Sequence, residues 1–196
     1  MKISVLLLAL SLTFTPISSQ GKTLKIATIS PDGISWIRKV RAGIKEIDRQ
    51  TEGRVKFKLY PGGVQGDDRT VLRKIKIGQL HGGAVAAGSL NRFYKDLQVY
   101  NLPLEFQSLE EVDYVRRRMD RTIVDGLAEA GIKTFGLMEA GFAYIMSMQP
   151  ISSVADARQA KVWVPDDDKM AVEMLKTFDI TPIPLDATDV IAGLQT

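Results

Sequence analysis

The sequence contains no cysteine and only one histidine, and both shortages narrow the chemistry that it can perform. Without cysteine, neither a disulfide framework nor a thiolate-ligated metal site can form. The single histidine, His81, would have to serve any Ser-His-Asp arrangement. It lies where a predicted helix leads into a predicted strand, whereas open α/β sheets bind ligands at the carboxyl ends of their strands. We therefore interpret His81 as structural, and no nucleophile is placed beside a base.

Two nucleotide-binding signatures are also missing. There is no G-x-x-x-x-G-K-[ST] loop, and the glycines at positions 82, 83 and 88 do not match G-x-G-x-x-G. The net charge is only +3, and the basic clusters at 69–76 and 116–118 fall in helical patterns. A nucleic-acid-binding protein would more often carry a basic stripe interleaved with aromatic residues. The sequence therefore predicts no cofactor and no nucleic-acid partner.

The longest apolar run stands at the very start of the chain. Lys2 is followed by residues 3–12, which are apolar except for two serines, then by Pro16 and the small residues Ser18 and Ser19. This order is typical of a secretory signal peptide, with cleavage after Ser19. The run is shorter than the ~20 apolar residues of a transmembrane helix, although an uncleaved anchor is an alternative. We expect residues 1–19 to be a signal peptide and the remaining chain to be exported and periplasmic.

Hydrophobic periodicity predicts a βαβαβ unit in the first part of the chain. Alternating or apolar runs indicate strands, and a spacing of three and four indicates helices. The predicted strands are 23–29, 54–60 and 82–87, and the predicted helices are 35–51 and the segment from Asp67 to near Gly78. Alternation of this kind favours a parallel sheet with right-handed crossovers.

Further along, the pattern is repeated after an irregular middle. Extended segments are predicted at 102–106, 133–138 and 144–147, and a long helix begins at the capping box of Ser108 and Glu111. A second α/β pattern then contains a short helix capped by Ser153, strands at 161–164 and 181–184, a helix after residues 166–168, and a last helix after Asp186. We expect a first α/β lobe over 20–140 and the start of a second, incomplete lobe over 141–196.

The glycine-rich turn at 61–66 lies at the end of the second predicted strand, where ligands of α/β sheets bind. It lacks the lysine of a phosphate-binding loop. Asp67 follows it as a helix cap, and we expect Asp68 to face a ligand. Asp67 with Asp68 could also chelate a cation, but adjacent carboxylates at a helix start are more often caps. The turn is best interpreted as one lip of a solute cleft.

Other strand ends supply further candidates for that cleft. Asp32 follows the first strand, and Ser89 follows the third. In the second lobe, Trp163 and Asp166 lie at a strand end, and Tyr144 lies where the chain crosses between lobes. Facing aromatic and polar groups suggest a clamp that closes on a small molecule by hinge motion. Trp163 and Tyr144 are explained about equally well as packing residues.

Four segments carry motifs that are informative as a set. They are residues 60–68 (YPGGVQGDD) with Leu72 and Gly78-Gln79-Leu80, residues 101–106 (NLPLEF), residues 149–165, and residues 181–195. Their order and spacing resemble the periplasmic solute-binding proteins of TRAP (tripartite ATP-independent periplasmic) transporters, the DctP-like family. The resemblance implies an α/β, two-lobed periplasmic-binding-protein-like (type II) fold with mainly parallel sheets. Because that family's chain continues well past this length, we expect a C-terminally truncated chain whose second lobe is incomplete.

One departure from the family pattern affects the expected ligand. The family usually has an arginine where Trp163 stands, which pairs with a substrate carboxylate, and a second arginine where Ala143 stands. A guanidinium fork suits a carboxylate and an indole does not. The resemblance therefore implies a non-standard ligand, and the ligand's identity is left open.

The leading interpretation is an exported solute-binding protein that is not an enzyme. It captures a small polar or organic-acid-like solute between two lobes and delivers it to the membrane permease subunits of a TRAP transporter. The expected ligand-binding residues are Asp68, Ser89, Trp163 and Asp166, with Asp32 and Tyr144 behind them, and no metal is expected. The alternatives are an exported two-lobed α/β enzyme that uses an Asp cluster with a metal, a ligand-sensing regulatory domain, and a fragment that binds nothing.

Overall fold

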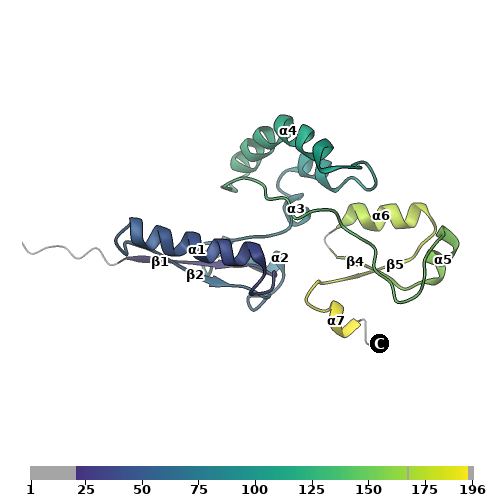
Figure 1. The fold of residues 1–196 in the computed structure, drawn as a ribbon, viewed down its shortest axis with the longest axis horizontal. Helices are drawn as coiled ribbons and strands as arrows, with labels where there is room; N and C mark the ends of the chain where they lie inside the picture. The colour runs from purple at the N-terminus through teal and green to yellow at the C-terminus, as the bar shows by residue number, and fades with distance from the viewer. Residues whose placement is uncertain (1–20, 167, 194–196) are drawn as a thin grey trace, which may run out of the picture.

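The structure is a computed structural model that describes residues 21–166 and 168–193. The elements, in chain order, are β1 (Lys22–Ala27), α1 (Ser35–Gln50), β2 (Val55–Tyr60), α2 (Asp68–Lys76), β3 (Gly82–Gly83), α3 (Ala87–Leu90), the 3-10 helix η1 (Lys95–Asn101), α4 (Leu109–Glu129), α5 (Val154–Gln159), β4 (Val162–Pro165), α6 (Lys169–Thr177), β5 (Pro182–Leu185) and α7 (Val190–Gly193). They form two α/β groups that lie next to each other, with α4 above them (Figure 1). The predicted signal peptide falls outside the described residues.

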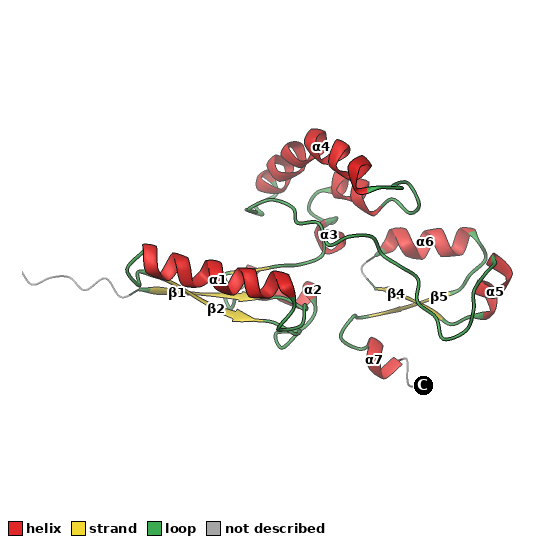
Figure 2. Ribbon diagram, viewed as in Figure 1, coloured by secondary structure: helices red, strands yellow, loops and turns green. Residues whose placement is uncertain are grey.

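The first sheet has three parallel strands in the order β2-β1-β3, which confirms the predicted parallel βαβαβ unit. Lys22 pairs with Val55 at one end of the β1–β2 ladder and Ala27 with Tyr60 at the other. Helix α1 runs along the sheet and fully buries Ile37 (Figure 2). Helix α2 contributes Val71 to the core of this group, where it packs with Ala27 and Leu80.

Helix α4, with α3 and η1, forms a separate helical layer. Its core consists of Leu72, Leu90, Leu97, Ile123 and Leu127. Gly126 allows the close packing, because a Cβ there would lie 2.3 Å from a ring carbon of Tyr94. The predicted start of the helix is confirmed: the N–H of Glu111 donates to Ser108 Oγ at 3.2 Å, and the Glu111 carboxylate accepts from the N–H of Gln107.

The second sheet pairs β4 with β5 in parallel, from Val162↔Pro182 to Pro165↔Leu185. Its core is small and contains Val164, Leu175 and Ile180. The predicted caps are present: Ser153 accepts from the N–H of Asp156 at the start of α5, and Asp168 accepts from the N–H of Ala171 at the start of α6. The second α/β pattern of the sequence is therefore confirmed element by element.

The three extended segments predicted in the middle of the chain are not strands in the structure. Residues 102–106 form a turn in which Leu104 has a φ of 62°. Residues 133–138 and 144–147 are irregular. Alternation of apolar residues makes a segment suitable for a sheet, but a strand also needs a neighbour, and none of the described strands lies beside these two segments.

The third strand is also shorter than predicted, since only Gly82 and Gly83 pair with β1. The N–H of Ala84 still reaches Ala27 O, but the N–H of Ala86 donates to Asp68 Oδ2 at 2.7 Å. The N–H of Ala86 is thus bonded to the Asp68 side chain instead of to β1, and α3 begins at Ala87. Within the described residues, no helix combines the length and the hydropathy needed to cross a membrane.

Candidate functional site

The glycine-rich turn lies at the carboxyl end of β2 and is bonded to the segment that follows β1. The N–H of Gly62 donates to Ser30 O at 2.8 Å, and the N–H of Gly63 donates to Thr28 O at 3.1 Å. Gly63 has a φ of 70°, and a Cβ at this position would lie only 3.2 Å from Thr188 Cγ2. The absence of a side chain therefore lets the turn approach the segment that follows β5.

Asp67 has the role that the sequence predicts. Its Oδ1 accepts from the N–H of Thr70 at 2.8 Å and so caps α2. Partial burial by itself would raise the pKa of the Asp67 carboxyl. The hydrogen bonds from Thr70, a side-chain hydrogen bond with Asp186 and the charge of Arg69 outweigh burial and hold that pKa below its usual value. The carboxylate is thus a cap that also contacts the second α/β group.

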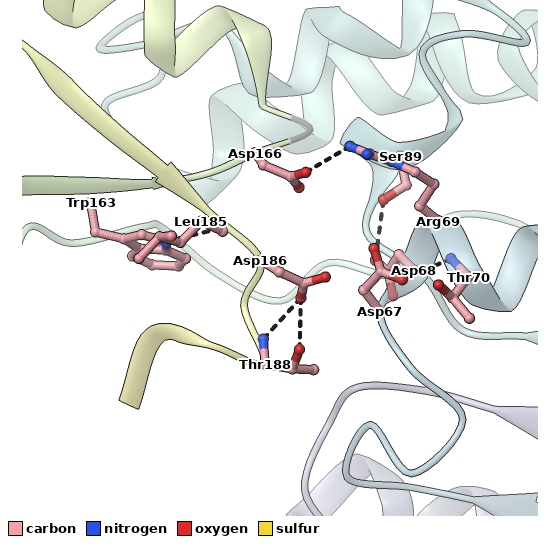
Figure 3. A network of polar contacts seen from close by, with 10 residues as sticks. All are labelled: Asp67, Asp68, Arg69, Thr70, Ser89, Trp163, Asp166, Leu185, Asp186 and Thr188. Carbon is pink, nitrogen blue, oxygen red and sulfur yellow. Dashed lines mark hydrogen bonds and ion pairs between the residues drawn. The ribbon is translucent and has the colours of Figure 1, made fainter. Parts of the chain in front are cut away.

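Asp68 and Ser89 lie together, but they bond to each other rather than projecting outward. Asp68 is only 6% exposed, and Ser89 Oγ donates to its Oδ2 at 3.3 Å (Figure 3). The same oxygen accepts from the N–H of Ala86. This network ties α2 to α3 and places both residues at the carboxyl ends of the first sheet.

An ion pair crosses from the first α/β group to the second. Arg69 Nη2 lies 2.8 Å from Asp166 Oδ2, and the bond joins the first turn of α2 to the segment that follows β4 (Figure 3). Together with the Asp67–Asp186 and Gly63–Thr188 contacts, it brings the carboxyl ends of β2, β4 and β5 face to face. The predicted candidate Asp166 is therefore at the junction of the two groups.

Sequence reasoning missed two residues of this junction. Arg69 belongs to a basic cluster that the sequence places only in a helical pattern, and Asp186 was expected only to begin a helix. A cation in the first turn of a helix is unfavourable beside the positive end of the helix dipole. That conflict was the available signal that Arg69 has a partner elsewhere. Asp186 does start a turn, since its Oδ1 accepts from the N–H of Thr188 at 3.0 Å.

Trp163 is held on an exposed face of the second sheet. Its Nε1–H donates to Leu185 O at 3.1 Å, and the residue is 36% exposed, whereas its neighbour Val164 is buried. Trp163 is therefore not a buried core residue, and its roles in ligand binding and in packing between the lobes both stay predictions. The hydrogen bond fixes the indole on the outer side of the sheet and leaves part of the residue accessible (Figure 3).

The last two candidates lie in loops, Asp32 after β1 and Tyr144 between α4 and α5. Asp32 forms a two-point ion pair with Arg41, at 2.7 and 3.2 Å. That hydrogen-bonded guanidinium, with the N–H of Gly33, lowers the pKa of the Asp32 carboxyl. Tyr144 lies in the segment that joins the two α/β groups and is 78% exposed. Both stay predictions as ligand-binding residues.

The acidic residues do not assemble a metal centre in the part of the chain that the structure describes, where no group of three or more potential ligands converges. One surface hollow, of about 520 Å³, borders the start of α4, near Phe106 and Tyr114. Another, of about 290 Å³, is lined by Tyr60 and Gln65 at the carboxyl end of β2 and by Lys25 of β1. We give more weight to the strand ends, because their polar contacts converge from both sheets.

Comparison with known proteins shows the family to which the chain belongs. The family model described as bacterial extracellular solute-binding protein, family 7 (DctP), matches residues 27–196. A sialic acid-binding periplasmic protein of Vibrio cholerae is 22% identical over 200 residues, which cover 100% of this chain and 60% of that protein. A C4-dicarboxylate-binding periplasmic protein of the same species is 22% identical, over 78% of this chain and 46% of that protein.

Solved structures agree on the fold. A TRAP periplasmic solute binding protein from Xanthobacter autotrophicus, with bound β-D-galacturonate, superposes with a TM-score of 0.80 at 22% identity. The match covers 88% of this chain and 58% of that one. One from Pseudomonas putida, with bound D-glucuronate, gives a TM-score of 0.81 at 21% identity. The expected two-lobed α/β fold is confirmed, and the chain spans about half the length of several of these proteins.

Proposed function

The chain belongs to the bacterial extracellular solute-binding proteins, family 7, and from this premise we propose that it captures a small solute between two lobes and delivers it to a TRAP transporter. The observation that carries the proposal is the junction of strand ends, where Arg69 and Asp166 meet at 2.8 Å. Strand ends of parallel α/β sheets are where such folds bind ligands. Residues 20–140 and 141–196 are the proposed lobes.

Four residues are proposed to contact the solute. Asp166 and Trp163 would do so from the second lobe, and Asp68 and Ser89 from the first. Asp166 is bonded to Arg69 at the junction, which supports its assignment. Because the buried Asp68–Ser89 pair is itself hydrogen-bonded, it would reach a solute only by exchanging one of these bonds. Asp32 and Tyr144 are proposed as outlying contacts.

The proposed solute is a small polar or organic-acid-like molecule with a flat or apolar part. Trp163 supports this choice, because its indole N–H is occupied by Leu185 O and only the ring remains for contact. An indole stacks on rings and apolar surfaces but cannot neutralise a carboxylate. The solute-binding relatives named above bind sialic acid, dicarboxylates and uronates. We propose that this protein differs from them in ligand choice.

The remaining parts of the proposal follow from the family. The protein would be exported to the periplasm and would meet the membrane permease subunits of a TRAP transporter there. Its action would be binding and release without catalysis, so that no cofactor or metal is needed. The named relatives from Vibrio cholerae are periplasmic binding proteins, which supports this location.

The test is a binding screen on the expressed chain by thermal shift and calorimetry. Its panel contains succinate, sialic acid, D-glucuronate, D-galacturonate and aromatic carboxylates. A true solute stabilises the folded chain by mass action, by about 2.7 kcal/mol at a hundred times its Kd, and so raises the melting temperature. We expect an aromatic or partly apolar solute to bind and Trp163→Ala to remove the effect. Tight succinate binding that survives Trp163→Ala would overturn the proposed ligand choice, and a folded chain that binds no solute would overturn solute capture.

A further inference from the structure

Arg69 occupies an unusual place for a cation. It lies in the first turn of α2, where the helix dipole favours negative charge. The cap of this helix is supplied by Asp67, so Arg69 is not needed to start it. The Arg69 side chain is 57% exposed and extends to the junction of the two α/β groups, where it meets Asp166 (Figure 3). Its position is therefore explained by what it binds at the junction and not by its own helix.

The bond between Arg69 and Asp166 uses only part of the guanidinium group. Nη2 donates to Asp166 Oδ2 at 2.8 Å, and this is the one hydrogen bond that the Arg69 side chain makes within the described residues. Asp32 and Arg41 show the two-point form in the same chain, because Nε and Nη2 of Arg41 bond to both oxygens of one carboxylate. Arg69 therefore keeps donors with which a carboxylate that is free to turn can form a second bond.

Asp166 holds Arg69 from a position that it can leave. Its side chain is 35% exposed, and within the described part of the chain its carboxylate accepts from Arg69 alone. Water can solvate this carboxylate when the bond breaks, and ion pairs between partly exposed side chains contribute little to stability. Another carboxylate can therefore replace Asp166 on the guanidinium at small cost.

We propose that Arg69 is the residue that binds the carboxylate of the solute, and that Asp166 occupies this carboxylate site until the solute displaces it. The proposal rests on the solute capture proposed above and names the group that gives it specificity. The Arg69–Asp166 pair lies at the strand ends, where α/β sheets of this kind bind ligands. Once displaced, the Asp166 carboxylate is available to accept a hydrogen bond from a solute hydroxyl.

The two α/β groups then contact different parts of the solute. Arg69 of α2 supplies the positive charge, which Trp163 cannot supply. The indole N–H of Trp163 is bonded to Leu185 O, and its partly exposed ring is left for an apolar or aromatic part of the solute. The site therefore suits a carboxylic acid that also carries a ring or an apolar surface.

The charges at the junction favour a solute with a single carboxylate. Figure 3 draws the carboxylates of Asp67, Asp68, Asp166 and Asp186 together with one cation, Arg69. The first carboxylate of a solute replaces Asp166 on Arg69. A second one enters a region that is already acidic, where like charges disfavour each other. We therefore expect a monocarboxylic acid to bind more tightly than a dicarboxylic acid.

The test compares acids with their uncharged amides by calorimetry on the full chain. The probes are phenylacetate, mandelate and D-glucuronate, each beside its amide, with succinate as the dicarboxylate. An acid should bind at least about tenfold more tightly than its amide, because hydrogen bonds to a charged group are the stronger ones. Arg69→Gln should weaken binding of the acid by about ten- to a hundredfold and leave binding of the amide unchanged.

A second variant should have the opposite effect. Asp166→Asn removes the competing charge, and it should tighten binding of phenylacetate, which has no hydroxyl for Asp166 to accept from, by up to about fivefold. Arg121→Gln, which breaks an exposed ion pair within α4, is the matched control and should leave every Kd unchanged. Because Arg69 and Asp166 are partly exposed, circular dichroism should show that their variants are folded.

The contrary outcomes separate this proposal from the solute capture on which it rests. An acid that binds Arg69→Gln as tightly as wild type would overturn the role of Arg69 and leave solute capture intact. An amide that binds as well as its acid, or weaker phenylacetate binding in Asp166→Asn, would do the same. Tighter binding of succinate than of phenylacetate would exclude the preference for a single carboxylate. A folded chain that binds none of the acids or amides would overturn solute capture itself, and this proposal with it.

Discussion

In both α/β groups, an aspartate caps the helix that follows a strand, but the acidic residue beside each cap has a different partner. After β2, Asp67 caps α2 through the N–H of Thr70 at 2.8 Å, and after β4, Asp168 caps α6 through the N–H of Ala171 at 3.0 Å. Next to the first cap, Asp68 points inward and bonds to α3. Near the second cap, Asp166 points outward and bonds to Arg69. One acidic residue thus stabilises its own group, while the other contacts its neighbour.

The hydrophobic core of the first group is more deeply buried than that of the second. The first group, taken together with the helical layer that shares Leu72 of α2 with it, contains Leu97, Ile123 and Leu127, all fully buried. The core residues of the second group, Val164, Leu175 and Ile180, each keep some exposure. Burial of apolar surface is the main source of stability. The first group should therefore be the more stable of the two, and the second the more easily displaced around a solute.

The largest effect on stability is expected from a substitution in the more deeply buried of the two cores. Leu127→Ala should lower the free energy of unfolding of the first group by about 3 kcal/mol, because it leaves a cavity among fully buried residues. The chain has two tryptophans, and Trp36 in α1 and Trp163 in β4 report one group each. Urea titrations of Trp36→Phe and Trp163→Phe backgrounds should show the loss at Trp36. Equal shifts at both tryptophans would show that the groups unfold as one unit.

A smaller loss is expected from the inward-pointing carboxylate. Asp68→Ala removes the acceptor of two hydrogen bonds, from the N–H of Ala86 and from the Ser89 hydroxyl, and hydrogen bonds to a charged group contribute about 1.5–3 kcal/mol. Denaturant unfolding followed at Trp36 measures it. Asp166 points outward, so Asp166→Ala should lower the free energy of unfolding much less than Asp68→Ala. Equal losses would mean that Asp166 is as structural as Asp68.

Much of this arrangement could be predicted from the sequence, and the exceptions share a cause. Periodicity located β1, α1 and β2 within two residues, and the Ser108, Ser153 and Asp67 caps are local patterns of a few residues. The length of β3 depends on Asp68, 18 residues from its partner Ala86, which no local pattern records. The partner of Arg69 lies 97 residues away. Residues 133–147 have the pattern of strands and lack a neighbour to pair with.

The two caps should each contribute about 1 kcal/mol, and the contribution of Asp67 should depend on pH. Asp67→Ala should lower the free energy of unfolding by that amount at pH 7. The folded-state pKa of Asp67 lies below the ordinary 3.8, so its contribution is complete above pH 3.8 and is lost as the pH falls through the lower folded value. Wild type and Asp67→Ala should therefore converge in stability below pH 3.8. A difference that persists at pH 2 would mean that the cap acts without its charge.

The smallest effect on stability, and the most direct test of the comparison, concerns the ion pair between the groups. Arg69 and Asp166 are both partly exposed, and such pairs contribute about 0.5 kcal/mol. Arg69→Met and Asp166→Asn should each change the unfolding midpoints little. The double variant should lose no more stability than either single variant, because both substitutions remove the same bond.

These substitutions should instead change the distance between the two groups. If this bond holds the strand ends together, small-angle scattering should show a larger radius of gyration in each variant and in wild type at 1 M salt, where the Debye length is about 3 Å. Lys176→Met, which removes an ion pair within α6, is the matched control and should leave the scattering unchanged. Unchanged scattering in all variants would show that the Arg69–Asp166 ion pair is not needed to hold the junction closed.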